Sequence, residues 1–282
     1  MGKKRILYVS QEISPYTKEN KRSNFCMNLP QVVQENDNDI RIFMPKFGTI
    51  NERRHQLHEV IRLSGMNLII DDFDHQLIIK VASVQQSRMQ VYFIDNEEYF
   101  PKRHYLNDPE GNFMQNNDER MMFFCKGVIE TVKKLGWAPD IIHCNGWFSA
   151  LVPMYIKKLY NKDPMFSNTK VYYTVFDNPF KGDLNNSLSE KLLFEDLQDK
   201  DVEMIGNPTF DNLNKFAISY SDAVVQGSKK LSKNLLNFIK NNNIPVLVKT
   251  DDDNFEEQCL SFYDSTKKPK KTKKNKQLVE VV

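Results

Sequence analysis

A histidine, a cysteine, an asparagine and a tryptophan stand close together in the stretch PDIIHCNGWFSALVPMY, residues 139–155. They follow an apolar run that is typical of a buried strand, and a helical pattern begins directly after them. His143 can act as an acid or base, or it can be a buried residue whose ring nitrogens are hydrogen-bonded, and the second role is the commoner one. Cys144 is interpreted as a buried, unreactive thiol rather than as a nucleophile. We expect four side chains to border a crevice at this strand end: His143, Cys144, Asn145 and Trp147.

The loop after the first expected strand carries positive side chains where a nucleotide-binding loop usually carries glycine. The chain has ten glycines, and neither GxGxxG nor GxxxxGK[ST] occurs in it. Backbone amides approach a phosphate most closely where no Cβ intervenes, so a tight backbone cradle is not expected. The segment TKENKRSNF offers Lys18, Lys21 and Arg22 instead. The sequence therefore predicts that any nucleotide is held here by charge.

Short apolar runs alternate with helical patterns along most of the chain. This order indicates repeated βαβ units and predicts a doubly wound, Rossmann-like α/β domain with a mostly parallel sheet. Residues 57–95 differ, because their short alternating runs indicate antiparallel strands of a β-hairpin insertion beside the main sheet. The expected strands of the main sheet are Lys4–Ser10, Asp39–Pro45, Asp140–Cys144, Lys170–Phe176, Asp222–Gln226 and Ile244–Lys249. The expected helices are Ser23–Gln34 with Ser23 as N-cap, Asn116–Gly136 with Gly136 as C-cap, Trp147–Tyr160, Leu188–Gln198, Phe210–Tyr220 and Lys229–Lys240.

Three loops are expected at one edge of this sheet. They are SQEISPYTKEN after the first strand, HCNGWF after the strand Asp140–Cys144, and FDNPFKG after the strand Lys170–Phe176. Ligands of doubly wound sheets bind beyond the carboxyl ends of the strands. We therefore expect the three loops to converge on a single crevice.

Composition limits the class of protein. The chain has 282 residues with 40% hydrophobic content, which suits one large domain or two small ones. Its four cysteines lie far apart without a CxxC, and no histidines cluster at metal-ligand spacing. We therefore expect a reduced, cytoplasmic protein with no metal and no cofactor. No apolar run approaches the roughly 20 residues of a spanning helix, so a membrane partner is not expected.

The net charge of +2 conceals a strongly basic terminus. Residues 267–282 carry seven lysines and one glutamate, and subtracting their +6 from the total leaves about −4 for residues 1–266. We expect one domain over residues 1–250, followed by an acidic and then lysine-rich tail over residues 251–282 that is disordered. A specific nucleic-acid partner is not expected, because the positive charge does not lie on a folded face beside aromatic side chains.

Five motifs in collinear order, together covering about residues 3–250, resemble the N-terminal domain of bacterial glycogen and starch synthases. ILYVSQEISPYTK resembles the family's strand and (V/A)xExxPxxKxGGLG loop, and NNDERMMFF resembles its DNxxRFxxF helix. LGWAPDIIHCNGWFSALVPMYIK resembles PDxxHxHDWHTAL…YLK. YYTVFDNPFKG resembles TIHNxxYQG, and NLNKFAISYSDAVVQGS resembles KxGIxYADxVxTVS. Members of the family are retaining glycosyltransferases that use ADP-glucose and have two Rossmann-like domains, so the resemblance implies one half of such an enzyme.

The resemblance also implies which residues meet the substrate. Lys18 stands at the position of the family lysine that contacts the phosphates of the donor. Asn116 takes the place of the aspartate of DNxxRF, and Asp177 takes the place of the asparagine of TIHN. No residue is assigned as catalytic. The substrate-binding residues implied in this way are Lys18, Asn116, Arg120, His143, Asn145, Trp147 and Asp177.

Several motif positions depart from the family pattern. The two glycines of KxGGLG are replaced by Asn20 and Lys21. In the HxHDWH motif, Asn145 replaces the second histidine, Gly146 replaces the aspartate, and Phe148 replaces the last histidine, which lies at the reacting centre in the family. These replacements remove side chains on which the family's chemistry depends.

The length of the chain bears on its expected function. In the family a C-terminal domain binds most of the ADP-glucose, and this sequence ends before such a domain, as in a short, single-domain form associated with Bacteroidetes-like bacteria. We therefore expect a glycogen or starch synthase-like glucosyltransferase domain that is incomplete alone. It would bind an α-glucan acceptor and ADP-glucose, with a partner chain supplying the donor domain. The alternative is a non-catalytic pseudoenzyme that binds glucan or protein, and a weaker third hypothesis is a nucleic-acid-associated protein acting through its lysine tail.

Overall fold

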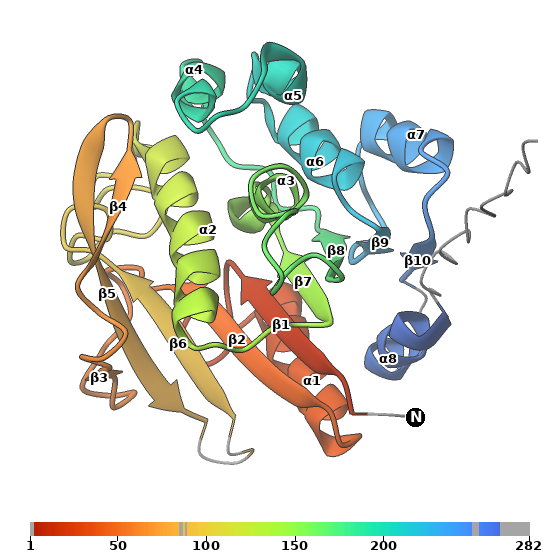
Figure 1. Ribbon diagram of the computed structural model, residues 1–282, viewed down its shortest axis with the longest axis horizontal. Helices are drawn as coiled ribbons and strands as arrows, with labels where there is room; N and C mark the ends of the chain where they lie inside the picture. Colours follow the sequence, from red (N-terminus) through yellow and green to blue (C-terminus); the bar gives the residue numbers. More distant parts are fainter. Residues whose placement is uncertain (1–2, 85–86, 88, 250–253, 266–282) are drawn as a thin grey trace, which may run out of the picture.

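The structure, a computed structural model, describes residues 3–84, 87, 89–249 and 254–265. A mixed β-sheet runs through the centre of this part of the chain, and helices pack on both of its faces (Figure 1). Ten strands of the described part contribute to the sheet, nine of them in the order β10-β9-β8-β7-β1-β2-β6-β5-β3, while β4 pairs with β5 outside this path.

The elements follow one another as the alternation of apolar patterns predicts. The strands are β1 (Arg5–Ser10), β2 (Asp39–Pro45), β3 (His58–Glu59), β4 (Met66–Ile70), β5 (Phe73–Ser83), β6 (Gln90–Asp95), β7 (Ile141–Asn145), β8 (Lys170–Val175), β9 (Ala223–Gln226) and β10 (Val246–Val248). The α-helices are α1 (Lys21–Glu35), α2 (Asn117–Lys134), α3 (Val152–Lys158), α4 (Leu188–Leu193), α5 (Asp199–Val202), α6 (Phe210–Ser219), α7 (Lys233–Asn241) and α8 (Phe255–Ser265). Each expected strand of the main sheet corresponds to an observed one.

The strands from β10 to β6 along the sheet are parallel to their neighbours. In β1 every residue after Arg5 is buried, because helices cover both faces of a doubly wound sheet. Tyr8 of β1 lies beside Ile42 of β2 on one side and beside His143 of β7 on the other. The strand order therefore reverses between β1 and β7, and this reversal is the place where a doubly wound sheet leaves a crevice.

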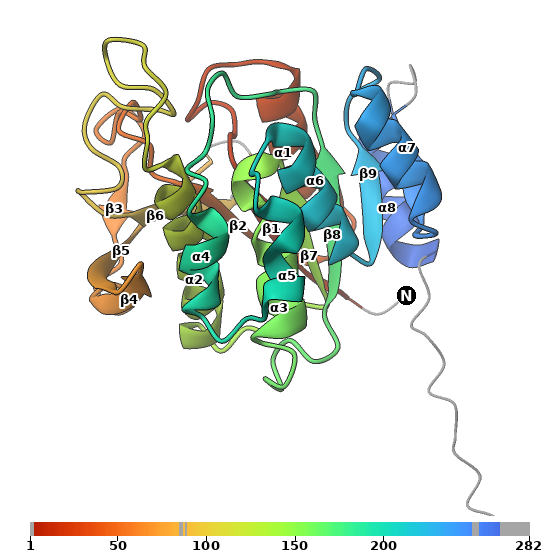
Figure 2. The same ribbon diagram turned by 90° about the horizontal axis from the view of Figure 1, so that it is seen from above.

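The helices form two layers, one on each face of the sheet. The connection from β1 to β2 through α1 runs in one direction along the sheet, and the connection from β6 to β7 through α2 runs in the other. Right-handed crossovers therefore place α1 and α2 on opposite faces. Helices α2, α3 and α6 pack in sequence on one face, while α8 packs against α1 (Figures 1 and 2). This arrangement confirms the doubly wound α/β class.

The insertion over residues 57–95 contains the expected antiparallel strands. Strand β5 pairs antiparallel with β3, β4 and β6, and β6 also pairs in parallel with β2. The insertion therefore extends the main sheet at one edge. Lys80 of β5 fastens it there, because its Nζ lies 2.8 Å from Asp95 Oδ2 and 2.9 Å from Glu52 Oε2.

The helix boundaries depart from the predicted ones where a local contact or a turn intervenes. Helix α1 is capped by Asn20, so the prediction that Ser23 is its N-cap is wrong. The helix expected over Trp147–Tyr160 begins as a 3-10 turn before α3, and the one expected over Leu188–Gln198 ends early, in a turn that contains Asp196 at φ 61°. Gly136 follows α2 with φ 63°, the left-handed conformation that ends many helices, as predicted.

The end of the described chain corrects one prediction. Residues 251–282 were expected to form a disordered tail, yet residues 255–265 form α8, whose Cys259 and Tyr263 are buried against the domain. The acidic segment can dock because its buried residues Phe255, Cys259 and Tyr263 recur every four positions and so fall on one helical face. The lysine-rich residues 267–282 lie outside the described part of the chain.

Candidate functional site

A cavity of about 570 Å³ lies at the carboxyl ends of the parallel strands. Its volume is typical of a small-molecule site. The three loops that were expected to converge all contribute to its wall, and so do residues that follow β2 and precede α2. The side chains that matter for the argument below are Gln11, Glu12, Lys18, Arg22, Trp147 and Asn178.

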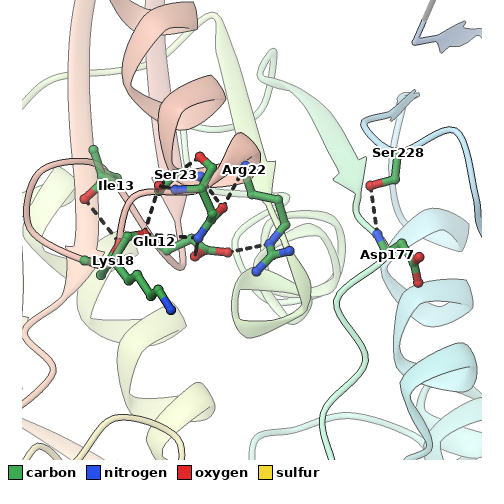
Figure 3. Close-up of polar contacts among 9 residues, drawn as sticks. Glu12, Ile13, Lys18, Arg22, Ser23, Asp177 and Ser228 are labelled. Carbon is green, nitrogen blue, oxygen red and sulfur yellow. Dashed lines mark hydrogen bonds and ion pairs between the residues drawn. The ribbon is translucent and has the colours of Figure 1, made fainter.

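Positive charge reaches the cavity from the loop between β1 and α1. Lys18 is exposed and lines the wall, and so does Arg22, whose side chain is 33% exposed. Glu12 holds Arg22 in place, because its Oε1 accepts a hydrogen bond of 2.6 Å from Arg22 Nε. Figure 3 shows the ends of Lys18 and Arg22 extending to the same side of this loop. Lys21, the third cation of the segment, is exposed and is not part of the cavity wall.

The N-terminus of α1 is closed by its own side chains. Asn20 Oδ1 accepts hydrogen bonds from the backbone N–H groups of Arg22, at 2.8 Å, and Ser23, at 3.0 Å. Ser23 Oγ in turn accepts from the N–H of Asn20 at 2.9 Å. This reciprocal arrangement is a capping box. It arises because asparagine is a strong N-cap residue, whereas the glycine of the family motif has no side chain to fill this position.

His143 does not line the cavity. Its side chain is fully buried on the face of the sheet that α8 covers, and its Nδ1 is hydrogen-bonded to the Tyr263 hydroxyl. Its Nε2 lies 2.6 Å from Thr174 Oγ1. Burial lowers the pKa of His143 to about 3, so the ring is neutral at physiological pH. The prediction that His143 borders the crevice is therefore wrong, and the alternative of a buried, hydrogen-bonded histidine is confirmed.

The neighbours of His143 are also buried, and only one of them reaches the cavity. Cys144 is fully buried, and burial raises the pKa of its thiol well above the ordinary value. Asn145 is buried at the end of β7, where its Nδ2 donates to Ser10 Oγ at 3.2 Å. Trp147 lines the cavity after the turn at Gly146, whose φ of 83° favours glycine. Cys144 and Asn145 were therefore wrongly expected at the crevice, and Trp147 was placed correctly.

Arg120 supports the wall of the cavity from behind. It is fully buried on α2, and its guanidinium donates to two backbone carbonyl oxygens, those of Tyr99 and Tyr105, at 2.6 Å each. Burial lowers the pKa of Arg120 to about 9. Tyr105 is part of the cavity wall, so Arg120 positions a wall residue without being part of the wall itself. Asn116 stands just before α2, where its side chain makes no capping hydrogen bond, and it does not line the cavity.

The loop after β8 closes the opposite side of the cavity. Asp177 is exposed, and its backbone N–H donates to Ser228 Oγ at 2.9 Å, so its carboxylate is not fixed by this contact (Figure 3). The cavity wall is formed instead by the next residues, Asn178 and Phe180 among them. Phe180 packs edge-on against Trp147, with the ring centroids 4.8 Å apart. The predicted Asp177 thus lies beside the cavity rather than in its wall.

Several wall residues were not predicted. Glu12 belongs to the ExxPxxK pattern and so had a sequence signal, whereas Gln11 precedes it without one. Tyr105 comes from an irregular stretch between β6 and α2 in which no periodicity or motif marked a functional residue. Its place in the wall follows from tertiary contacts, those of its carbonyl with Arg120 and of its ring with Phe47.

The described residues also bear on metal sites and on membrane spans. No group of three or more His, Cys, Asp and Glu side chains in the described ranges is arranged to hold a metal ion. Within those same ranges, no helix combines the length and the hydropathy needed to cross a membrane. The four cysteines are all buried and free.

Comparison with known families identifies the family to which this domain belongs. The model of a family described as "Starch synthase catalytic domain" matches residues 5–247. The chain belongs to this starch synthase family. The match includes all the loops that line the cavity, and it confirms the resemblance that the five motifs indicated.

The chain is also similar to proteins named glycogen synthase. It is 38% identical over 194 residues to a glycogen synthase of Chlorobium limicola, covering 68% of this chain and 40% of that protein. It is 35% identical over 233 residues to a glycogen synthase of Chlorobaculum tepidum, covering 82% of this chain and 47% of that protein. The chain therefore spans less than half the length of the glycogen synthases it matches.

A solved structure of the starch synthase family has the same fold. The catalytic domain of Starch Synthase IV from Arabidopsis thaliana, bound to ADP and acarbose, superposes with a TM-score of 0.68 at 19% identity. The superposition covers 87% of this chain and 52% of that one. At this identity the likeness establishes the fold of the domain.

Proposed function

We propose that this starch synthase domain takes part in the transfer of glucose from ADP-glucose to an α-1,4-glucan, and that the cavity at the carboxyl ends of β1, β7 and β8 receives the substrates. The observation that carries the proposal is the convergence of three family motif loops on one cavity. That cavity combines cations with an aromatic wall. Cations suit the diphosphate of a nucleotide sugar, and an aromatic face suits a sugar ring.

The proposed roles follow from position. Lys18 would contact the diphosphate, because it is exposed and lies in the wall. Trp147 would form the apolar side of the sugar site together with Phe180. Asp177, beside the wall, would contact a glucan chain that extends out of the cavity. For His143, Asn145, Asn116 and Arg120 we propose that they shape and support the site without touching the ligand.

A finer proposal concerns the second half of the reaction. Because the glycogen synthases of Chlorobium and Chlorobaculum are more than twice as long as their matched regions, we propose that a second, donor-binding domain faces this cavity and that a partner chain supplies it. Electrostatic stabilisation of a departing diphosphate is often the largest single catalytic contribution, so the second wall would add most of the activity. The cytoplasm, where soluble nucleotide sugars occur, is the proposed location.

A radiolabelled transfer assay tests this function. The purified chain is incubated with ADP-[14C]glucose and maltooligosaccharides, alone and with the C-terminal half of the Chlorobaculum tepidum glycogen synthase. We expect transfer to appear or to rise strongly in the mixture. Binding of maltooligosaccharides without transfer in either case would contradict an enzyme and would indicate a non-catalytic glucan-binding module.

Binding can be followed in the same protein by fluorescence. The chain has two tryptophans, Trp137 and Trp147, and only Trp147 lines the cavity. In a Trp137→Phe variant the remaining emission reports on the cavity wall. We expect ADP-glucose and maltooligosaccharides to change this emission, whereas a Trp147→Phe variant, which keeps Trp137, should not respond.

A further inference from the structure

The N-terminus of α1 differs from that of a glycine-rich phosphate-binding loop. The first N–H groups of a helix are the usual anion-binding donors at such a site. In this chain the N–H groups of Arg22 and Ser23 are already bound to Asn20 Oδ1, at 2.8 and 3.0 Å. A ligand phosphate could take them only by displacing a side chain of the protein.

The positively charged donors at this end of the cavity belong to the side chains of Lys18 and Arg22. Arg22 pairs with Glu12 through its Nε, and within the described residues its two terminal nitrogens donate no hydrogen bond. They lie in the cavity wall together with Lys18 (Figure 3). The planar end of arginine offers parallel N–H groups whose geometry matches two oxygens of a phosphate.

Glu12 makes this end of Arg22 rigid. Its side chain is only 9% exposed, and both of its oxygens are occupied. Oε1 accepts from Arg22 Nε, and Oε2 accepts from Asn20 Nδ2 at 2.8 Å. The capping residue and the cation are thus held by one buried carboxylate. The charges of Lys18, Arg22 and Glu12 sum to about +1, which leaves the group attractive to an anion.

Two side chains of the same wall each have an amide oxygen without a hydrogen-bond donor. Gln11 is 3% exposed, yet its Oε1 has no hydrogen-bond partner among the described residues, and the same holds for Asn178 Oδ1. Both side chains line the cavity. Buried acceptors without partners are uncommon and are costly unless a ligand or water donates to them. Because these two oxygens are themselves buried, a sugar or ribose hydroxyl would reach them only after a rotation of the amide side chain.

We propose that Arg22 is a phosphate-binding residue of this site, acting with Lys18 through side chains in place of the backbone amides that Asn20 has closed, and that the ligand is a sugar-bearing diphosphate. This proposal rests on the proposed function for the identity of the ligand. It does not follow from the family motif, because Arg22 occupies the position of the leucine in KxGGLG. Asn20, which replaces a glycine of the motif, occupies the helix amides, and Arg22 then supplies donors in their place.

Calorimetric titration of the full chain with pyrophosphate and, separately, with ADP-glucose tests the proposal. We expect Arg22→Leu, which restores the residue of the motif, to weaken binding of both ligands about tenfold or more, as for the loss of a charged hydrogen-bonding group. Arg22→Lys should lie between that variant and the original chain. Lys21→Ala is the matched control, because it removes an equal charge one residue away and outside the cavity wall, and it should bind as the original chain does.

A second pair of variants separates binding from folding. Removing Arg22 leaves Glu12 buried without its cation, so the double variant Glu12→Gln with Arg22→Leu is measured beside the single one, each with a thermal unfolding curve. Glu12→Gln alone removes a negative charge next to Arg22 and should tighten pyrophosphate binding a few-fold. The proposal is overturned if a folded Arg22→Leu variant binds pyrophosphate as tightly as the original chain, or if Lys21→Ala weakens binding equally.

Pyrophosphate binding and glucose transfer can each fail without the other. If glucose transfer is absent in every mixture but pyrophosphate binding follows the expected order of variants, the anion site stands and the synthase activity is wrong. If the original chain binds no pyrophosphate at millimolar concentration, the anion site is wrong even where transfer is observed.

Discussion

The loop between β1 and α1 and the end of β7 both carry motif residues of the starch synthase family. The two regions differ in how far these side chains are exposed. Lys18 in the loop and Arg22 in the first turn of α1 line the cavity and remain accessible. At the end of β7, His143 and Asn145 are buried, and only Trp147 reaches the cavity wall. The comparison shows that a motif residue near a loop can stay accessible to a ligand, whereas one inside a central strand packs between the layers.

The physical reason is the pleat of the strand. Successive side chains of a strand point to opposite faces of the sheet, so His143 faces the layer that contains α8. There it meets Tyr263, which comes from a segment 120 residues further along the chain. The β1–α1 loop lies beyond the end of its strand, and its Lys18 is exposed. Stability should therefore depend on the β7 end, and ligand binding on the loop.

The largest effect on stability is expected for Trp147→Ala. Trp147 is 1% exposed and packs against Phe148 and Phe180, so its removal leaves a cavity. We expect the free energy of unfolding to fall by about 3–5 kcal/mol, measured by urea denaturation. Trp147→Phe keeps an aromatic ring and should cost clearly less. A loss below about 1 kcal/mol for the alanine variant would show that the indole serves the ligand rather than the fold.

The free energy of unfolding should depend on pH because of His143. The unfolded chain takes up a proton near the ordinary pKa of 6.5, while the folded chain does so only near 3, so the unfolded state binds more protons between these values. Stability should consequently fall as the pH drops below 6.5, by about 2 kcal/mol between pH 7.5 and pH 5. His143→Gln removes this titration and should flatten that part of the profile. Equal slopes for the two proteins would place the titration elsewhere.

An intermediate effect on the free energy of unfolding is expected for changes at Asn20, the N-cap of α1. Asn20→Ala removes the acceptor for the N–H groups of Arg22 and Ser23 and should lower the free energy of unfolding by about 1 kcal/mol. Asn20→Gly should cost only a few tenths of a kcal/mol and leave both amides open to a ligand. Pyrophosphate titration of the glycine variant should show tighter binding than the original chain. Unchanged affinity would mean that the ligand does not approach the helix N-terminus.

The smallest effect on stability belongs to Lys18→Ala. Lys18 is exposed, so its loss should change the free energy of unfolding by less than about 0.5 kcal/mol. The dissociation constant for ADP-glucose should nevertheless rise about tenfold, because a charged donor to the diphosphate is lost. Lys21→Ala serves as the control with no expected change in either quantity. A large loss of stability, or unchanged affinity, would remove the contrast between the two regions.

Much of the fold could be predicted because it depends on local patterns. Strands such as β1 and β7 are short, mostly apolar runs that are buried on both faces, and their alternation with helical patterns is sufficient to indicate a parallel sheet. The boundary of α1 was missed because two neighbouring polar residues, Asn20 and Ser23, can each cap a helix. Which one does so depends on the backbone of the loop. Helix α8 was missed because its apolar residues lie beside a highly charged stretch and are buried by a distant element, α1.

The sequence by itself determined the family, the order of the elements and the three loops that meet in the cavity, because collinear motifs and apolar periodicity are local properties. Only the tertiary structure decided which motif side chains are accessible. His143 became a buried contact because α8 returns to cover β7, and Arg120 became a support because its carbonyl partners come from a loop. Arg22 became a cavity residue because Glu12, ten residues earlier, fixes its direction. Such outcomes depend on long-range packing, which residue spacing alone does not specify.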